Sequence, residues 1–308
     1  MVVSLLAKLS KDLLLPKERL EYLIRSAPYR YKVYEVPKRS GTGMRTIAQP
    51  AKEVKRLQYW VIENLFPRLP IHPSATAYIK AKNILNNSEL HVAKPYLLKL
   101  DFVDFFPSIK GDDFIQYIRE LNNLDLDELD LQLLVRILFW YPKRIHNLQL
   151  SVGAPSSPYL SNAIMHRFDS EIESYCCQRS ITYTRYADDM TFSMMEKAAR
   201  SEVLNRVLQV IQQLPFPKLQ INQKKTIFGS KAHRRMVTGL VLSNAGRVSL
   251  GREKKRRIRA QIHHLITGHL TPQEKSSLRG MLAFARSIEP NFVERMEQKY
   301  GKRVLSNI

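Results

Sequence analysis

Two segments that lie far apart in the chain place three carboxylates at the ends of short predicted strands. Residues 96–102, YLLKLDF, form an apolar run with Asp101 near its end. Residues 181–194, ITYTRYADDMTFSM, alternate as two strands around a turn that holds Asp188 and Asp189. If these segments are neighbouring strands, the three carboxylates meet at one point and repel one another unless divalent cations lie between them. A joint site for the three carboxylates would therefore require both segments to share one sheet.

Each segment also has a less specific interpretation. A pair of aspartates in a turn is common turn chemistry. A carboxylate at the end of a buried strand is harder to dismiss, because burying its charge without a partner is costly or raises its pKa. Oxygen ligands without His or Cys nearby favour Mg²⁺ or Mn²⁺ over Zn²⁺. Two such ions are suited to in-line phosphoryl transfer, so the sequence predicts a two-metal site.

The remaining chain mixes helices and strands without a regular strand–helix–strand repeat, which favours an α+β fold. Helices are predicted over residues 1–30, 52–66, 124–140, 157–172, 197–214 and the last sixty residues. Strands are predicted over 31–36, 45–50, 96–102, near 219–222 and over 235–242. The acidic residues of 124–140 are expected to be solvated. Ser157 is expected to cap a helix with one face formed by Leu160, Ile164, Phe168 and Ile172.

Composition narrows the class of partner. The 308 residues include 49 Lys or Arg and 28 Asp or Glu, a net charge of +21, which indicates a polyanionic partner such as nucleic acid. A charge that serves only solubility is the alternative. The two cysteines, Cys176 and Cys177, are adjacent and cannot alone build a disulfide framework or a zinc site. No apolar run approaches the ~18 residues needed to span a bilayer, so we expect a soluble, cytoplasmic protein without a membrane partner.

Five motifs occur in a characteristic order. They are LDFVDFFPS (100–108), GAPSSPYLSN (153–162), YADD (186–189), INQKKT (221–226) and VTG (237–239). Together they resemble the boxes of retron-type reverse transcriptases, which are bacterial RNA-directed DNA polymerases, and the similarity extends over nearly the whole chain. It implies a right-hand polymerase with fingers in residues 1–95, palm in 96–243 and a helical thumb in 244–308.

The resemblance implies roles for individual residues. Asp101, Asp188 and Asp189 would be the catalytic triad that binds two Mg²⁺ ions, for which Mn²⁺ can substitute, with the Phe102 carbonyl as a further ligand. Phe106 would meet the sugar of the incoming nucleotide and exclude a 2′-OH, with core packing as the alternative. The other residues expected at the nucleotide are Lys38, Arg45, Asp104, Phe105, Gly153, Lys224 and Lys225.

Among these, Lys38 and Arg45 would hold the triphosphate, although a solvated basic hairpin has the same appearance. Lys224 or Lys225 would donate a proton to the leaving pyrophosphate, and the pattern does not choose between them. Val152 precedes Gly153 where many relatives have Gln, so a polar side-chain contact is lost there.

A second group of residues is expected to bind nucleic acid. Asn87 and His91 resemble the ends of a family NAxxH box in which Ser88 replaces Ala, and VTG supplies Val237, Thr238 and Gly239. A predicted thumb helix would follow the phosphates of a duplex, or would be a solvated basic helix. Its cations are Arg252, Lys254, Lys255, Arg256, Arg257 and Arg259.

The implied function is the copying of a cognate structured non-coding RNA into RNA-linked single-stranded DNA (multicopy single-stranded DNA) from dNTPs, with a role in anti-phage defence. The expected partners are that RNA and its cDNA, an accessory effector protein and a separate ribonuclease H, because no length remains for such a domain. The alternatives are a catalytically inactive RNA-binding relative and a group II intron-like reverse transcriptase. The three aspartates argue against the first, and the lack of length for a maturase extension argues against the second.

Overall fold

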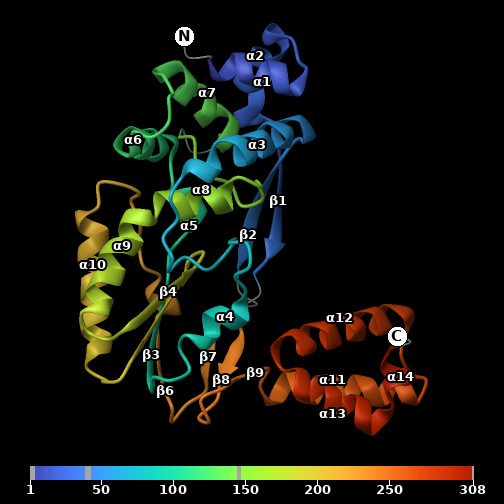
Figure 1. The fold of residues 1–308 in the computed structure, drawn as a ribbon. Coiled ribbons are helices and arrows are strands. Elements are labelled where there is room, and N and C mark those ends of the chain that lie inside the picture. Colours follow the sequence, from blue (N-terminus) through green and yellow to red (C-terminus); the bar gives the residue numbers. More distant parts are fainter. Residues whose placement is uncertain (1–3, 39–42, 144–146, 307–308) are drawn as a thin grey trace. The chain divides into compact units, whose positions relative to one another are not determined.

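The computed structural model describes residues 4–38, 43–143 and 147–306. Helices and strands are mixed along the chain, and antiparallel strand pairs occur in each sheet of the described residues (Figure 1). This confirms the predicted α+β class. The described residues include no helix long and apolar enough to cross a membrane. Cys176 and Cys177 are both free thiols, the first buried and the second exposed.

The chain forms two compact units. Unit 1 comprises Met1–Lys80, Leu100–Met190 and Ser201–Thr226, and unit 2 comprises Ala81–Lys99, Thr191–Arg200 and Ile227–Ile308. Neither unit coincides with residues 1–95, 96–243 or 244–308, so the division into fingers, palm and thumb stays a prediction.

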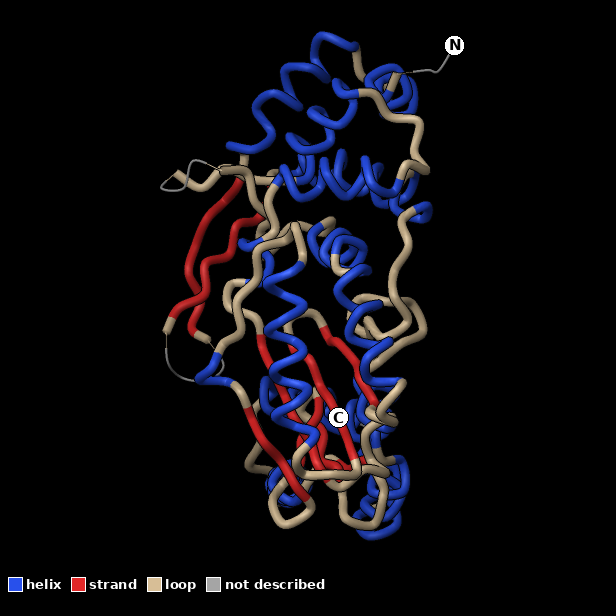
Figure 2. Tube along the Cα trace, turned by 90° about the vertical axis from the view of Figure 1, so that its left-hand side faces the viewer, coloured by secondary structure: helices blue, strands red, loops and turns tan. Residues whose placement is uncertain are grey.

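Unit 1 begins with helices that pack through leucines. Leu5, Leu9 and Leu13 are buried on one face of α1, which ends where Leu14 adopts a left-handed backbone with φ 53°. Pro16 then precedes the next helix. The first elements are α1 (Leu5–Leu13), α2 (Lys17–Ser26), η1 (Ala27–Tyr29), β1 (Tyr31–Pro37), β2 (Met44–Pro50), α3 (Lys52–Asn64) and η2 (Phe66–Arg68). Figure 2 shows β1 and β2 as a long hairpin.

A four-stranded sheet carries the three aspartates. Its order is β4 (Thr182–Tyr186), β5 (Asp189–Met194), β3 (Tyr96–Asp101) and β6 (Ile227–Ser230). Since β5 lies next to β3, the two aspartate segments are neighbouring strands, which is the arrangement that a joint carboxylate site requires. The strand expected near 219–222 is wrong, because that segment makes one bridge, between Ile221 and Phe102, and then turns into η3 (Gln223–Lys225).

Two helix predictions need correction. Residues 157–172 form two helices, α8 (Ser157–Ile164) and α9 (His166–Cys177), because ψ at Met165 is −1°. The N-cap is Ser156 and makes no side-chain bond, although the predicted face of Leu160, Ile164, Phe168 and Ile172 is indeed buried.

The acids of α7 (Glu128–Leu138) are also not uniformly solvated. Asp130 is buried and accepts a hydrogen bond from the Leu5 amide over 3.1 Å. It thereby satisfies an orphan donor at the start of α1. The other helices with residues in unit 1 are α5 (Phe105–Ser108), α6 (Gly111–Leu121) and α10 (Ala199–Gln213).

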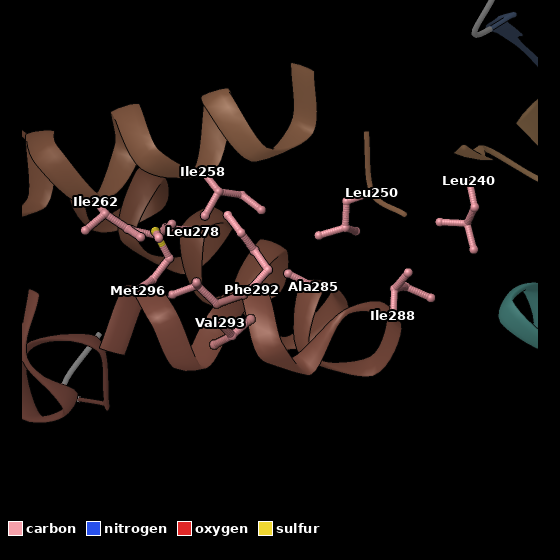
Figure 3. Close-up of a cluster of buried hydrophobic side chains, with 11 residues drawn as sticks. Leu240, Leu250, Ile258, Ile262, Leu278, Ala285, Ile288, Phe292, Val293 and Met296 are labelled. Carbon is pink, nitrogen blue, oxygen red and sulfur yellow. The ribbon is translucent and has the colours of Figure 1, made fainter. Parts of the chain in front are cut away.

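Unit 2 contains a small sheet and a helical bundle. Apolar side chains of three helices point toward one another, among them Ile258, Ile262, Ala285, Phe292 and Met296 (Figure 3). The elements are α4 (Ile84–Glu89), β7 (Arg235–Val237), β8 (Leu240–Leu242), β9 (Val248–Ser249), α11 (Arg252–Ile266), α12 (Pro272–Ile288), α13 (Pro290–Tyr300) and α14 (Lys302–Ser306).

Candidate active site

Asp101 is buried at the end of β3, and its carboxylate is paired. The Lys225 ammonium lies 2.9 Å from each of its two oxygens. The Asn222 amide donates to the Asp101 carbonyl over 2.7 Å, which fixes the start of η3 against the strand end. Burial alone would lower the pKa of Lys225, but its hydrogen bonds to Asp101 and the attraction of that charge raise it. Lys225 is therefore a protonated cation at the first aspartate.

The turn between β4 and β5 brings Asp188 to the same place. The Phe102 amide donates to the Asp188 carbonyl over 3.3 Å, which ties the turn to the end of β3. Burial raises the pKa of the Asp188 carboxyl, and the negative charge of Asp101 raises it further, whereas Lys225 and Arg45 oppose the shift. Two carboxylates thus share one site with two cations within electrostatic reach.

The chemistry of these donors suits a hard divalent cation. They are carboxylate and carbonyl oxygens, which Mg²⁺ and Mn²⁺ prefer. Within the described ranges, no three His, Cys, Asp or Glu side chains gather closely enough to form a ready-made cation site. The ammonium of Lys225 instead supplies the positive charge at Asp101. The oxygen donors therefore fit such a metal. In this structure the Asp101 carboxylate is paired with the ammonium of Lys225.

A pocket of about 360 Å³ lies in unit 1. It is lined by Lys55, Tyr59, Tyr78, Phe106, Ser151, Val152, Gly153, Ala154, Pro155, Ser157 and Pro158. Burial raises the pKa of Tyr78, and the charge of Asp188 raises it further while Arg45 lowers it. Tyr78 therefore both lines the pocket and interacts electrostatically with Asp188. Ser151 and Ser157, both among the described residues, have buried hydroxyls without a protein hydrogen-bond partner.

Gly153 is required by close packing. Its φ is +128°, and an added Cβ would lie 3.0 Å from the Ala48 carbonyl oxygen. The preceding residue, Val152, accepts the Ala48 amide over 2.9 Å. Val152 thus accepts a hydrogen bond through its backbone carbonyl. Together, Val152 and Gly153 pack this wall of the pocket closely against β2, the strand that also contains Arg45.

The first-aspartate motif divides into an inner and an outer part. Phe105 is buried and stacks on Phe102, with ring centroids 5.6 Å apart. Its side chain therefore packs in the core, and a contact of Phe105 with the nucleotide stays a prediction. Phe106 is half-buried and lines the pocket. Asp104 is exposed in a left-handed conformation with φ 43°, and its carbonyl accepts the Ser108 amide and hydroxyl.

The chain is similar in sequence to proteins of known family. Residues 36–247 match the model of the family described as reverse transcriptase (RNA-dependent DNA polymerase). The chain belongs to this family. It is 41% identical to the retron Ec83 reverse transcriptase of Escherichia coli over 94% of this chain and 93% of that protein. It is 35% identical to the retron Ec86 reverse transcriptase of the same species over 99% and 93%.

The chain is thus a retron-type reverse transcriptase, an RNA-directed DNA polymerase. Among solved structures it is similar to a foamy viral protease–reverse transcriptase in complex with dsDNA, with 14% identity, a TM-score of 0.48, and coverage of 100% of this chain and 58% of that one. A telomerase from Candida albicans in complex with a telomeric RNA fragment gives 9% identity, a TM-score of 0.48, and coverage of 90% and 56%. The α+β organisation with antiparallel sheets is consistent with the right-hand fold expected for this family.

The basic residues expected at the nucleotide of this reverse transcriptase differ in their surroundings. Lys38 and Arg45 are exposed near the end of the β1–β2 hairpin, with Arg45 opposite Val36. Both lysines are exposed, but Lys225 pairs with Asp101 and Lys224 lies outside that ion pair. The structure thus separates two lysines that the sequence left equivalent.

The two retron-type motifs of unit 2, residues 87–91 and 237–239, are joined by hydrogen bonds. Asn87 and His91 are buried, and His91 Nδ1 lies 2.9 Å from the Ser193 hydroxyl. Ser88 bonds to the Val237 carbonyl and the Thr238 hydroxyl over 3.0 and 3.1 Å. The side chains of Asn87, His91 and the equally buried Val237 thus pack inside the fold, and a contact of these residues with nucleic acid stays a prediction.

The exposed part of the same region is the turn at Thr238 and Gly239, where Thr238 is half-buried and Gly239 exposed. The basic run of α11 is likewise divided. Lys254 donates to the Gly239 carbonyl over 2.8 Å, and Lys255 pairs with Glu289 over 2.5 Å. The cations with exposed side chains elsewhere in the run are Arg252, Arg256, Arg257 and Arg259.

Several residues of the site have no signal in the local sequence. Lys55, Tyr59 and Tyr78 line the pocket, yet each lies in a segment without a motif that we recognised. Arg185 directly precedes the YADD motif, but nothing in the local sequence indicates that its charge is fully buried. Contacts between distant segments define these residues, so an alternation or spacing rule applied along the chain misses them.

Proposed function

We propose that this polymerase copies a cognate structured non-coding RNA into RNA-linked single-stranded DNA, and that it acts in anti-phage defence with an accessory effector. A separate ribonuclease H would remove the template. The observation that carries the proposal is the 41% identity to a retron reverse transcriptase over nearly the full length of both chains. A polymerase restricted to one RNA needs both a catalytic centre and a surface for that RNA.

Asp101, Asp188 and Asp189 would hold two Mg²⁺ ions, or Mn²⁺, with the Phe102 carbonyl as a further ligand. Such ions, when bound, activate the attacking hydroxyl and stabilise the leaving oxygen in an in-line displacement. The oxygen-only donor set and the mutual influence of Asp101 and Asp188 support this assignment.

Lys225, in preference to Lys224, is our candidate for the proton donor to pyrophosphate. Its contact with Asp101 supports the choice, because a proton donor must lie near the reacting phosphate. Arg45 and Lys38 would neutralise the triphosphate from the β1–β2 hairpin. The influence of Arg45 on the pKa of Asp188 supports its proximity to this charge.

The pocket would receive the sugar and base of the dNTP. Phe106 would exclude a 2′-OH by its bulk, and Gly153 would let the pocket wall approach β2. The unpartnered hydroxyls of Ser151 and Ser157 support a polar occupant, because buried hydroxyls without partners are costly.

The RNA would contact the exposed surface of unit 2. Arg252, Arg256, Arg257 and Arg259 on α11 offer cations to the phosphate backbone, and the turn at Thr238 and Gly239 offers backbone groups. Such contacts suit structured RNA, because A-form duplexes are recognised mainly by shape, phosphates and 2′-hydroxyls.

The test is to purify the protein with its copurifying nucleic acid and to supply dNTPs and Mg²⁺. We expect DNA that shifts in size after ribonuclease treatment, because part of the product is RNA. The Asp188→Asn protein, purified identically, is the control and should yield none. DNA without attached RNA, or equal synthesis on any RNA added, would contradict the proposed substrate.

A further inference from the structure

Arg185, the residue directly before the Tyr186–Asp189 turn, carries a fully buried charge. Its Nε lies 2.9 Å from Asp169 Oδ1 and its Nη2 2.6 Å from Asp169 Oδ2, so the two side chains form a two-point ion pair. Tyr183 donates its hydroxyl to Asp169 Oδ1 over 2.7 Å. A buried ion pair needs such additional bonds, because desolvation of the charges otherwise outweighs their attraction.

The third nitrogen of Arg185 reaches the aspartate turn. Its Nη1 donates to the Ala187 carbonyl and to Asn162 Oδ1, each over 3.1 Å. Ala187 has φ 57°, a left-handed conformation that is unfavourable for a residue with a Cβ. The bond from Arg185 holds this peptide unit immediately before Asp188.

The same centre also holds the wall of the pocket. The Arg185 carbonyl accepts the Thr76 amide over 2.8 Å. Asn162, the second partner of Nη1, donates to the Ala77 carbonyl over 2.9 Å. Tyr78, which lines the pocket, follows directly. One buried guanidinium therefore connects the carboxylate turn with the segment that presents Tyr78.

We propose that Arg185, held by Asp169, is a positioning residue that fixes the Asp188 carboxylate relative to the Tyr78 wall of the pocket. It acts through the Ala187 carbonyl and Asn162 and does not touch the substrate. The inference rests on the polymerase activity of the family and on the proposed metal role of Asp188.

The first test is Arg185→Lys in the full-length protein. Lysine keeps the charge but offers a single nitrogen, which cannot serve Asp169, Asn162 and the Ala187 carbonyl together. We expect kcat and Mn²⁺ affinity, measured by electron paramagnetic resonance, to fall about 10- to 100-fold, as for other residues that orient metal ligands. Amide exchange in residues 186–190 should become faster, while KM for dNTP and RNA affinity change little.

Arg235→Lys is the matched control. Arg235 is also a fully buried arginine, and it donates to the carbonyls of Lys94 and Ser243 in unit 2. We expect it to lower the melting temperature without changing Mn²⁺ affinity or exchange of the turn. If Arg185→Lys behaves in the same way, Arg185 is only a structural residue and the proposal is overturned.

Asn162→Ala decides the matter if Arg185→Lys does not fold, because it leaves the ion pair with Asp169 intact. Faster exchange of the turn and weaker Mn²⁺ binding support the proposal, and wild-type values for both overturn it. If the wild-type protein itself binds no Mn²⁺, the metal assignment fails separately, and exchange of the turn still tests Arg185.

Discussion

Charge is used in opposite ways in two regions of this molecule. Beneath the aspartate turn of unit 1, Arg185 and Asp169 are fully buried and saturated with hydrogen bonds. On α11 of unit 2, Arg256 and Arg257 are exposed. A buried, bonded charge fixes position, whereas an exposed charge attracts a polyanion without fixing its register. Changes in the first region should therefore act on catalysis, and changes in the second on affinity.

The largest effect should come from Asp188→Asn. Loss of one metal-binding carboxylate should lower primer extension about a thousandfold or more, since metal stabilisation of the transition state is worth several kcal/mol. RNA affinity should persist, because the residue makes no proposed phosphate contact. Extension at a near wild-type rate would remove Asp188 from the catalytic centre.

The same variant should be more stable than wild type at neutral pH. Burial and the charge of Asp101 raise the pKa of Asp188, so its ionised form is disfavoured in the folded protein. The neutral amide relieves this repulsion, and the melting temperature should rise. A lower melting temperature would show that the carboxylate is stabilised by its cations.

The second effect separates two adjacent lysines. Lys225→Ala should lower kcat about a hundredfold, within the range for loss of a general acid, because Lys225 contacts Asp101. Lys224→Ala, the matched control, should stay near wild type. Equal losses in single-turnover rates would indicate a shared electrostatic role, and the assignment of Lys225 would be wrong.

The sequence predicted the strands that carry the three aspartates because strand alternation is a local signal, and the resemblance to reverse transcriptases predicted that these aspartates act together. It also predicted the β1–β2 hairpin. It failed where a distant segment decides the outcome. Asp130 looked solvated on its own helix, yet the amide of Leu5 lies against it. Arg185 looked like one residue of an alternating strand, and only the fold brings Asp169 and Asn162 around it.

The third prediction concerns the pocket of unit 1. Phe106→Ala should open space beside the sugar and reduce discrimination between dNTPs and rNTPs about tenfold or more, a size typical for one steric contact. The ratio of kcat/KM values for dGTP and GTP measures this. Phe105→Leu, a change in the buried neighbour, is the control and should affect stability more than selectivity. Unchanged selectivity in an active Phe106→Ala protein would mean that the ring only packs.

The fourth prediction tests the exposed charges of unit 2. Arg256→Ala combined with Arg257→Ala should weaken RNA binding and reduce the slope of log affinity against log salt by ~2, about one for each phosphate contact. Lys255→Ala should leave that slope nearly unchanged, because Lys255 is paired with Glu289. Titrations between about 50 and 200 mM salt cover the sensitive range. Equal slopes for all three proteins would assign the basic helix to solvation.

The smallest effect at neutral pH should come from His91, a buried titratable group in unit 2. Burial, assisted by the charge of Lys94, lowers its pKa from 6.5 to about 3. In the unfolded chain this imidazole is protonated below pH 6.5, whereas in the folded protein it stays neutral down to about pH 3. The free energy of unfolding therefore falls as the pH decreases through this window. The slope of the free energy of unfolding against pH is about 1.4 kcal/mol per pH unit for one such group.

The test is His91→Gln, which has no titrating ring. Between pH 6.5 and 5 its free energy of unfolding, measured by urea unfolding, should fall by about 2 kcal/mol less than that of the wild type. The exposed His264→Gln is the control and should follow the wild-type curve. If His91→Gln follows it as well, the imidazole takes up its proton inside the folded protein, and burial does not hold it neutral.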